Sequence, residues 1–193
     1  MRAAAELFHR QGFSGTGLTE IGLRSGANKG SLYHFFPNGK TELGAAVVTY
    51  SGKLVETTLT DLAEQASDTS DIISRYVKML SIWLRDSRFR RGNPITTMLL
   101  EEAPGDRAIT AAGLEAYDAW ISVFTSRLIK DGVAASRARR VARLIIAGLD
   151  GALVQARVQE CADPLFEVAE ELQKIVTSAR SESKPRPRTR AER

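Results

Sequence analysis

The stretch that decides the fold is "SGANKGSLYHFFPNGKTEL", Ser25 to Leu43. Gly26 stands where a left-handed residue ends a helix over Leu18–Ser25. Pro37 ends a second short helix over Lys29–Phe35, because the residue before a proline is pushed out of helical geometry. Two short helices joined by a tight turn with glycine, after an earlier helix closed by Gly12, predict a helix-turn-helix.

The same stretch contains "GKT" at Gly39 to Thr41, which is the end of the phosphate-loop signature GxxxxGK[ST]. That signature requires a glycine at the position of His34, and it requires a preceding strand. The segment "SLYHFF" has helical spacing instead. We therefore interpret "GKT" as the beginning of a helix, with Asn38 or Gly39 as its cap.

The second helix of a helix-turn-helix enters the major groove of double-stranded DNA, with its N-terminal residues at the base edges. We expect these residues to be Asn28, Lys29, Gly30 and Ser31, while Tyr33, His34 and Lys40 contact phosphates. For His34, an ordinary surface position is an equally good interpretation. We expect Leu32, Phe35 and Phe36 to belong to the core.

Helical spacing continues along most of the chain, and no segment alternates as a strand does. The sequence predicts an all-α fold of about nine helices, in which an N-terminal three-helix domain precedes a helical ligand-binding and dimerisation domain. The expected boundaries are residues 1–50, residues 51–179 and a basic tail over residues 180–193. We expect that tail to be disordered because it has no large apolar residue to bury.

Charge and composition exclude several classes of protein. The net charge of +4 divides into +2 over residues 1–50, −2 over residues 51–179 and +4 over residues 180–193, so a polyanion would be met at the two ends. The single cysteine, Cys161, excludes an intramolecular disulfide. The chain has few Cys and His residues for catalysis. Its acidic pairs are adjacent in sequence, so the two carboxylates of a pair do not face each other on a helix. Both observations argue against an enzyme. We expect no metal, no cofactor, no membrane span and a cytoplasmic location.

The middle helices carry most of the large side chains. An apolar cavity for a small-molecule effector is predicted from Met79, Trp83, Met98, Leu99, Tyr117, Trp120 and Phe124. For each of these residues, a plain core position is the alternative.

The last two helices combine small and large apolar residues, which predicts a four-helix bundle between two chains. The predicted dimerisation residues are Ile145, Gly148, Leu149, Ala152, Leu165, Leu172 and Ile175. The alternative is that these helices pack only on their own subunit.

The segment "TGLTEIGLRSGANKGSLYHFFPNGKTEL" resembles the TetR family of bacterial repressors, in the subgroup with a "KGSLYHHFPGGK"-type core. The resemblance covers about Ala4 to Val48, and "GNPITTMLLEEAP" is similar to part of the same subgroup's regulatory domain. It implies a homodimer on a palindromic operator, released by an apolar or aromatic small molecule. It also implies DNA contacts at Lys29, Gly30, Ser31, Tyr33, His34 and Lys40.

This chain departs from the family pattern at three places, one of which is Gly22, where an alanine is commoner inside the second helix. Many members have a Ser or Thr that caps the second helix and contacts a phosphate, and here that position is Gly17, with Thr16 and Thr19 beside it. Members also have further, often basic residues before the first helix, whereas Met1 falls almost inside it. We include Thr19 among the expected DNA contacts. The alternative function is a helical ligand-binding or interaction module that has lost DNA binding.

Overall fold

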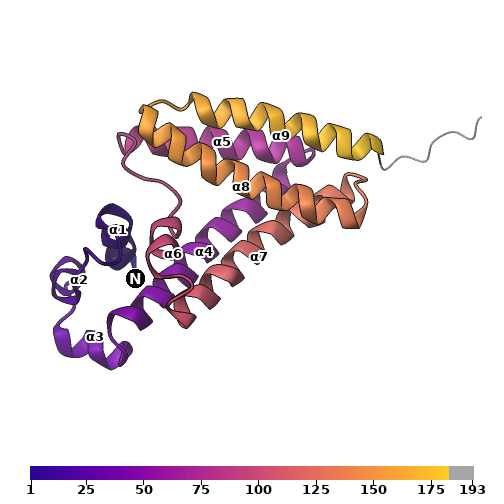
Figure 1. The fold of residues 1–193 in the computed structure, drawn as a ribbon. Coiled ribbons are helices and arrows are strands. Elements are labelled where there is room, and N and C mark those ends of the chain that lie inside the picture. Colours follow the sequence, from indigo (N-terminus) through magenta and orange to yellow (C-terminus); the bar gives the residue numbers. More distant parts are fainter. Residues whose placement is uncertain (183–193) are drawn as a thin grey trace, which may run out of the picture.

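The computed structural model describes residues 1–182, apart from the side chain of Lys29. Within this part of the chain there are nine α helices and no strand, which confirms the predicted all-α fold (Figure 1). They are α1 (Arg2–Gln11), α2 (Leu18–Ser25), α3 (Lys29–Phe35), α4 (Lys40–Gln65), α5 (Thr69–Asp86), α6 (Thr96–Glu102), α7 (Arg107–Lys130), α8 (Ala135–Gln159) and α9 (Asp163–Glu182). Residues 180–182 thus belong to α9, and the rest of the predicted tail lies outside the described residues.

The helices α1, α2 and α3 form a head at one end of the molecule, and α4 runs from this head into the body (Figure 1). Gly26 ends α2 with a left-handed backbone at φ 71°, and the side chain of Asn28 caps α3 by accepting from Ser31 N at 2.7 Å. The expected core position of Phe35 is wrong, because this side chain is 69% exposed. Of the three apolar residues predicted there, Phe36 is the one that packs against the core.

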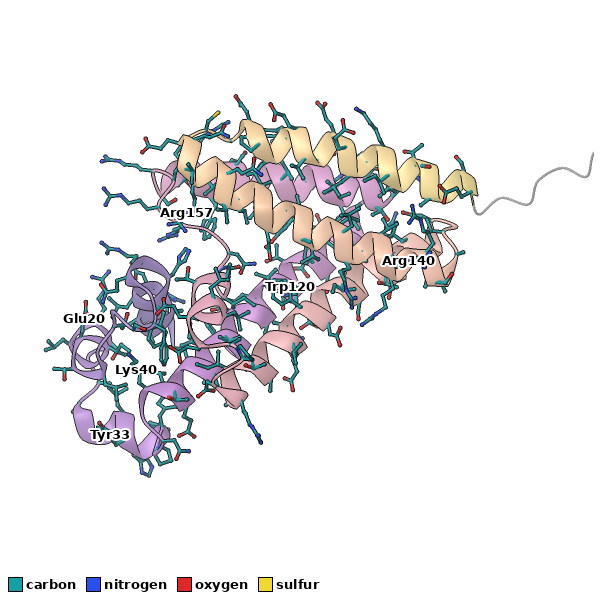
Figure 2. The ribbon with its side chains drawn as sticks, viewed as in Figure 1. Glu20, Tyr33, Lys40, Trp120, Arg140 and Arg157 are labelled. Atoms are coloured by element: carbon teal, nitrogen blue, oxygen red, sulfur yellow. The ribbon has the colours of Figure 1, made fainter. Side chains whose placement is uncertain are left out.

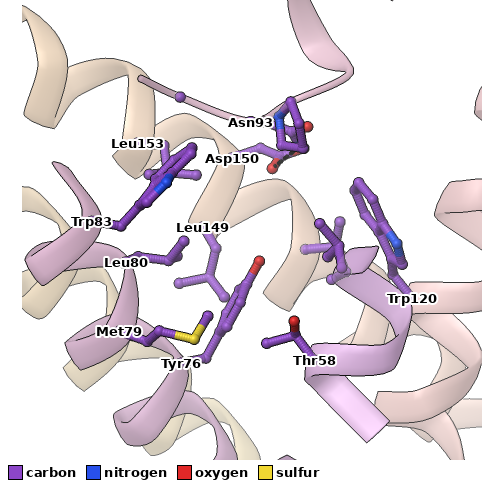
Figure 3. A pocket seen from close by; sticks show the side chains of 14 residues that line it. Thr58, Tyr76, Met79, Leu80, Trp83, Asn93, Trp120, Leu149, Asp150 and Leu153 are labelled. Carbon is purple, nitrogen blue, oxygen red and sulfur yellow. Dashed lines mark hydrogen bonds between the residues drawn. The ribbon is translucent and has the colours of Figure 1, made fainter. Parts of the chain in front are cut away.

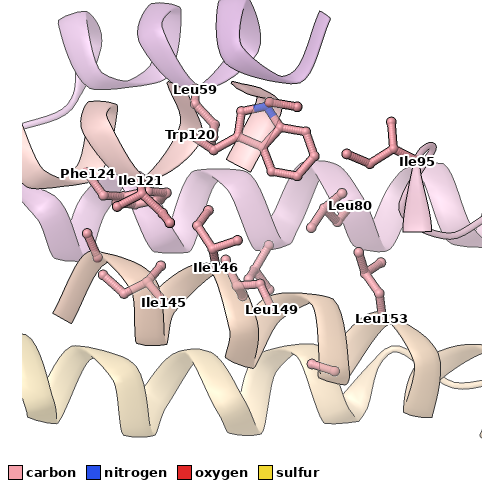
Figure 4. Close-up of a cluster of buried hydrophobic side chains, with 14 of the residues drawn as sticks. Leu59, Leu80, Ile95, Trp120, Ile121, Phe124, Ile145, Ile146, Leu149 and Leu153 are labelled. Carbon is pink, nitrogen blue, oxygen red and sulfur yellow. The ribbon is translucent and has the colours of Figure 1, made fainter. Parts of the chain in front are cut away.

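The body is built on the pair α4 and α7, which lie side by side, while α5, α8 and α9 form a second group beyond them (Figure 1). Close approach of α4 and α7 requires Gly52, since a Cβ there would lie 2.7 Å from the Cβ of Ala116. The buried indole of Trp120 donates to the Gly52 carbonyl at 2.9 Å. Figure 4 shows Trp120 and Phe124 facing Ile145, Ile146 and Leu149 of α8, which closes the core between the two groups.

A side chain caps the start of α5. Asp68 precedes the helix and accepts from Asp71 N at 3.0 Å. The Asp71 carboxylate reaches back and accepts from Ser67 N at 3.0 Å. The first bond satisfies a backbone donor that the first turn of a helix leaves without an intrahelical partner, and the second fixes the residue before the cap to that turn.

A buried ion pair fixes the end of the body that lies farthest along α4. The guanidinium of Arg127 contacts Asp131 at 3.0 Å and donates to the carbonyls of Ala63 and Ala66 at 2.9 Å each. The other oxygen of Asp131 accepts from the hydroxyl of Thr69 at 2.6 Å. Because both charges are hydrogen-bonded, their burial is tolerated, and the end of α4 is held to α5 and α7.

Among the described residues, no helix has both the length and the apolar character that a membrane span requires.

Candidate functional site

A cavity of about 210 Å³ lies between α4, α5, α7 and α8. The loop that joins α5 to α6, residues 87–95, closes one side of it with Gly92, Asn93 and Pro94. The side chains around this space are mostly apolar or aromatic, as Figure 3 shows. Such a lining, with a few polar groups among it, is typical of small-molecule sites.

The structure brings three of the seven predicted cavity residues together at this space: Met79, Trp83 and Trp120. Met98 and Phe124 do not line it, because they are buried in the core with exposed fractions of 1% and 0%. Leu99 packs against Gly113 of α7 instead. Tyr117 also lies outside the wall, although its hydroxyl bonds to a residue within it.

The polar groups of the cavity are centred on Asp150, which the sequence prediction missed. One carboxylate oxygen of Asp150 accepts from Asn93 Nδ2 at 2.7 Å, and the other accepts from the Tyr117 hydroxyl at 3.0 Å. Burial raises the pKa of Asp150, although these two donors oppose the rise. Burial, and then the charge of Asp150, raise the pKa of Tyr117 to about 12 and also raise the pKa of Tyr76. A signal for Asp150 exists, since it is the one acidic residue in α8 and follows the apolar run Leu144–Leu149.

The closing loop also contacts the head. Gly92 N donates to Nε2 of His9 at 2.8 Å, and the His9 ring stacks on Trp83 with centroids 5.9 Å apart and planes 6° from parallel. Burial, followed by the positive charges of Arg157 and Arg91, lowers the pKa of His9 to about 4. The ring is therefore neutral at pH 7, as an Nε2 acceptor must be. Adjacent residues of one loop thus bond to α1 on one side and to α8 on the other.

A second junction joins the head to α6. The Glu101 carboxylate accepts from Phe13 N at 3.1 Å and from Ser14 N at 2.7 Å. Lys40 donates to the Phe13 carbonyl at 2.9 Å, and its ammonium lies 4.4 Å from the centre of the Phe13 ring. Lys40 was expected at a DNA phosphate, but in this structure its ammonium holds the turn after α1.

The other predicted DNA contacts lie on α2 and α3. Lys29 is the first residue of α3, Gly30 is exposed and Ser31 is half-buried. Thr19 and His34 are exposed, and Tyr33 is 45% exposed at the outer end of the head (Figure 2). The hydroxyl of Thr16 is buried and donates to the Gly12 carbonyl at 2.7 Å, which leaves Thr19 as the available hydroxyl at the start of α2.

The predicted dimerisation residues mostly face the interior of their own chain. Ile145, Leu149, Ala152, Leu165 and Leu172 are all less than 5% exposed, Ile175 is half-buried, and Gly148 lies against Val168 and Leu172 of α9. Ile145 and Leu149 face α7 (Figure 4), and Gly148 lies against α9, so these residues pack within one chain, which was the alternative interpretation. The outer face of α8 instead exposes Leu144, Gly151, Val154 and Val158, which we call the outer α8 stripe.

Both parts of the chain are similar to known transcriptional regulators. Residues 1–47 match bacterial regulatory proteins of the tetR family, and residues 69–171 match the C-terminal domain of transcriptional regulators like LmrA and YxaF. The uncharacterized HTH-type transcriptional regulator YxaF of Bacillus subtilis (strain 168) is 32% identical over 91% of this chain and 92% of its own. The HTH-type transcriptional regulator LmrA of the same strain is 30% identical over 88% and 90%. A crystal structure of a TetR transcriptional regulator from Legionella pneumophila has the same fold, with a TM-score of 0.79, 17% identity and coverage of 90% and 93%.

The neutral state of His9 predicts a loss of stability in mild acid. The pKa of His9 is about 6.5 in the unfolded chain and about 4 in the folded one, so between these values only the unfolded chain binds the extra proton. From pH 7.5 to pH 5, His9 should therefore remove about 2 kcal/mol from the free energy of unfolding.

Urea unfolding at the two pH values measures this loss. His9→Gln should show a smaller decrease in stability than the wild type, because the titrating ring is gone. His34→Gln, which replaces the exposed histidine of the head, is the matched control and should behave as the wild type does. Equal pH dependence in all three proteins would contradict the assignment.

Proposed function

The chain belongs to the TetR family of helix-turn-helix transcriptional regulators, and from that premise we propose that it is a ligand-responsive repressor. The resemblance found in Thr16 to Leu43 is thereby confirmed. Its relatives are transcriptional regulators, which is a class without enzymatic activity. The effector is an apolar or aromatic small molecule that fills the cavity and releases the protein from a palindromic operator.

The observation that carries this proposal is the loop shared by the cavity and the head. Asn93 donates to Asp150 at the cavity wall, while its neighbour Gly92 donates to His9 of α1. A ligand that moves Asn93 or Trp83 therefore acts on residues in direct contact with α1. The ligand shifts the equilibrium between DNA-binding and released states only if it binds the two with different affinity.

We assign the DNA interface to the exposed side of α2 and α3. Lys29, Gly30 and Ser31 stand at the N-terminus of α3, where a recognition helix meets base edges. Thr19, Tyr33 and His34 are the candidates for phosphate contacts. Lys40 is left out of the direct contacts, because its ammonium is bonded to Phe13.

We also propose a homodimer, because one helix-turn-helix reads one half-site of a palindrome. The outer α8 stripe is its most suitable surface. Leu144, Val154 and Val158 are 46%, 54% and 81% exposed on one helix. A Cβ at Gly151 would meet no atom within 4 Å, so this position leaves room for a second chain to approach closely.

The DNA interface predicts a specific loss of affinity. Lys29→Ala should weaken binding to the DNA upstream of the gene by about 1–3 kcal/mol, which is about 5-fold to 150-fold. Fluorescence anisotropy with labelled DNA measures it. Lys78→Ala, which removes an exposed lysine of α5, should leave affinity unchanged. If both Lys29→Ala and Tyr33→Ala bind as tightly as the wild type, α3 does not contact the operator.

The dimer surface predicts a change of mass in solution. The wild type should have twice the chain mass of 21.1 kDa at micromolar concentration, measured by light scattering after gel filtration. Val154→Glu combined with Val158→Glu should give the monomer, because two charges would be buried without partners. Leu114→Glu, at a residue of α7 that is 67% exposed, should remain dimeric. If the Val154→Glu, Val158→Glu variant is still a dimer, the two chains pair through another face.

A further inference from the structure

The cavity lining carries one acidic side chain, which indicates the charge of the ligand that would fit it. Among the residues that line the cavity, Asp150 is the one with an ionisable charge at neutral pH. Its two hydrogen bonds come from an amide and a phenol, Asn93 and Tyr117, which are both neutral donors. Each carboxylate oxygen has lone pairs for further hydrogen bonds, so Asp150 retains unused capacity as an acceptor.

No basic side chain of the described residues forms an ion pair with Asp150. The nearby guanidinium groups lie toward α1 instead. Arg91 lies over Trp83 with its Cζ 5.9 Å from the ring centre, and Arg157 packs against Gly92. A carboxylate in an apolar setting without a cationic partner costs free energy, and that cost is relieved when a cation binds.

The walls around Asp150 suit the body of such a cation. Trp83, Trp120 and Tyr76 surround the space with aromatic rings, and Tyr76 points its hydroxyl toward the side where Asp150 and Asn93 lie (Figure 3). Faces of aromatic rings attract cations within about 6 Å. Met79 and Leu149 add apolar surface between them. One end of the cavity therefore offers a negative charge, and the remainder offers apolar and aromatic contact.

We propose that the cavity binds a lipophilic organic cation, an amine whose ammonium group pairs with Asp150 while its apolar body packs between Trp83 and Trp120. The inference rests on the proposed function only for the choice of this cavity as the effector site. An ammonium group uses lone pairs of Asp150 that Asn93 and Tyr117 leave free, and its charge draws on the same carboxylate to which Asn93 donates. A shift of that carboxylate acts through Asn93 on the loop whose preceding residue, Gly92, bonds to His9.

The test compares two probes that differ in charge. Phenylbutylamine is protonated at neutral pH, whereas phenylbutanol has the same length, an aromatic end and a hydrogen-bond donor without charge. The chain has two tryptophans, and both line the cavity, so intrinsic fluorescence reports binding at this site. The wild type should bind the amine about tenfold more tightly than the alcohol, equivalent to about 1.4 kcal/mol.

Variants assign that preference to Asp150. Asp150→Asn keeps the shape and loses the charge, so it should bind amine and alcohol about equally, with affinity for the alcohol as in the wild type. Asp118→Asn, at an exposed aspartate of α7 paired with Arg139, should retain the preference. A wild type that binds both probes equally, or neither, overturns the proposal, and so does a preference that persists in Asp150→Asn. If Asp150→Asn does not fold, the affinities of the wild type for the amine and the alcohol still test whether the cavity prefers a cation.

Operator release is measured separately, by anisotropy with labelled DNA in the presence of each probe. Release by the alcohol as efficiently as by the amine would retain the repressor function and overturn the cationic ligand. An Asp150-dependent preference for the amine without any DNA binding would retain the cation site and contradict the proposed function.

Discussion

Two hydrogen bonds from adjacent residues connect the parts of this molecule. Gly92 donates to His9 in the head, and Asn93 donates to Asp150 in the cavity. The two residues are neighbours in the chain, so a displacement of one is passed to the other through a single peptide unit, which is planar and stiff. The same loop closes one side of the cavity, and the charge of its Arg91 adds to the burial and the Arg157 charge that lower the pKa of His9.

The long helix α4 provides a second connection between the same two regions. Its first residue, Lys40, holds Phe13 in the head, while Val55 and Thr58 near its middle line the cavity. Its far end is fixed by the buried guanidinium of Arg127. A helix that is fixed at one end and contacts the cavity in its middle is a suitable element to transmit a change to the head. Packed elements of this kind shift between discrete arrangements rather than deforming continuously.

The helix-turn-helix could be predicted from sequence because its causes are local. Gly26, Asn28 and Pro37 set the bounds of α2 and α3 through backbone geometry and capping, which need no knowledge of distant residues. The exposure of Phe35 could not be predicted, since it depends on which side of a seven-residue helix meets the head.

The cavity and the dimer surface depend on tertiary packing in the same way. Helical spacing showed that α7 is apolar on the side of Phe124, but not that this side is covered by the core. On α8, the more strongly apolar stripe is used inside the chain, which leaves the weaker stripe with Val154 and Val158 outside. Asp150 was missed because a single charge in an apolar run has no periodic pattern, although its isolation in α8 is itself a signal.

If the loop couples the cavity to DNA binding, loss of the Asn93 side chain must lower the affinity for the operator. Asn93 lies on the body side of the loop, where it bonds to Asp150 of α8. Asn93→Ala should fold normally but bind the operator about fivefold or more weakly, in line with coupling energies of about 1–3 kcal/mol. A folded Asn93→Ala protein with wild-type operator affinity, measured by anisotropy at the same salt concentration, would contradict it.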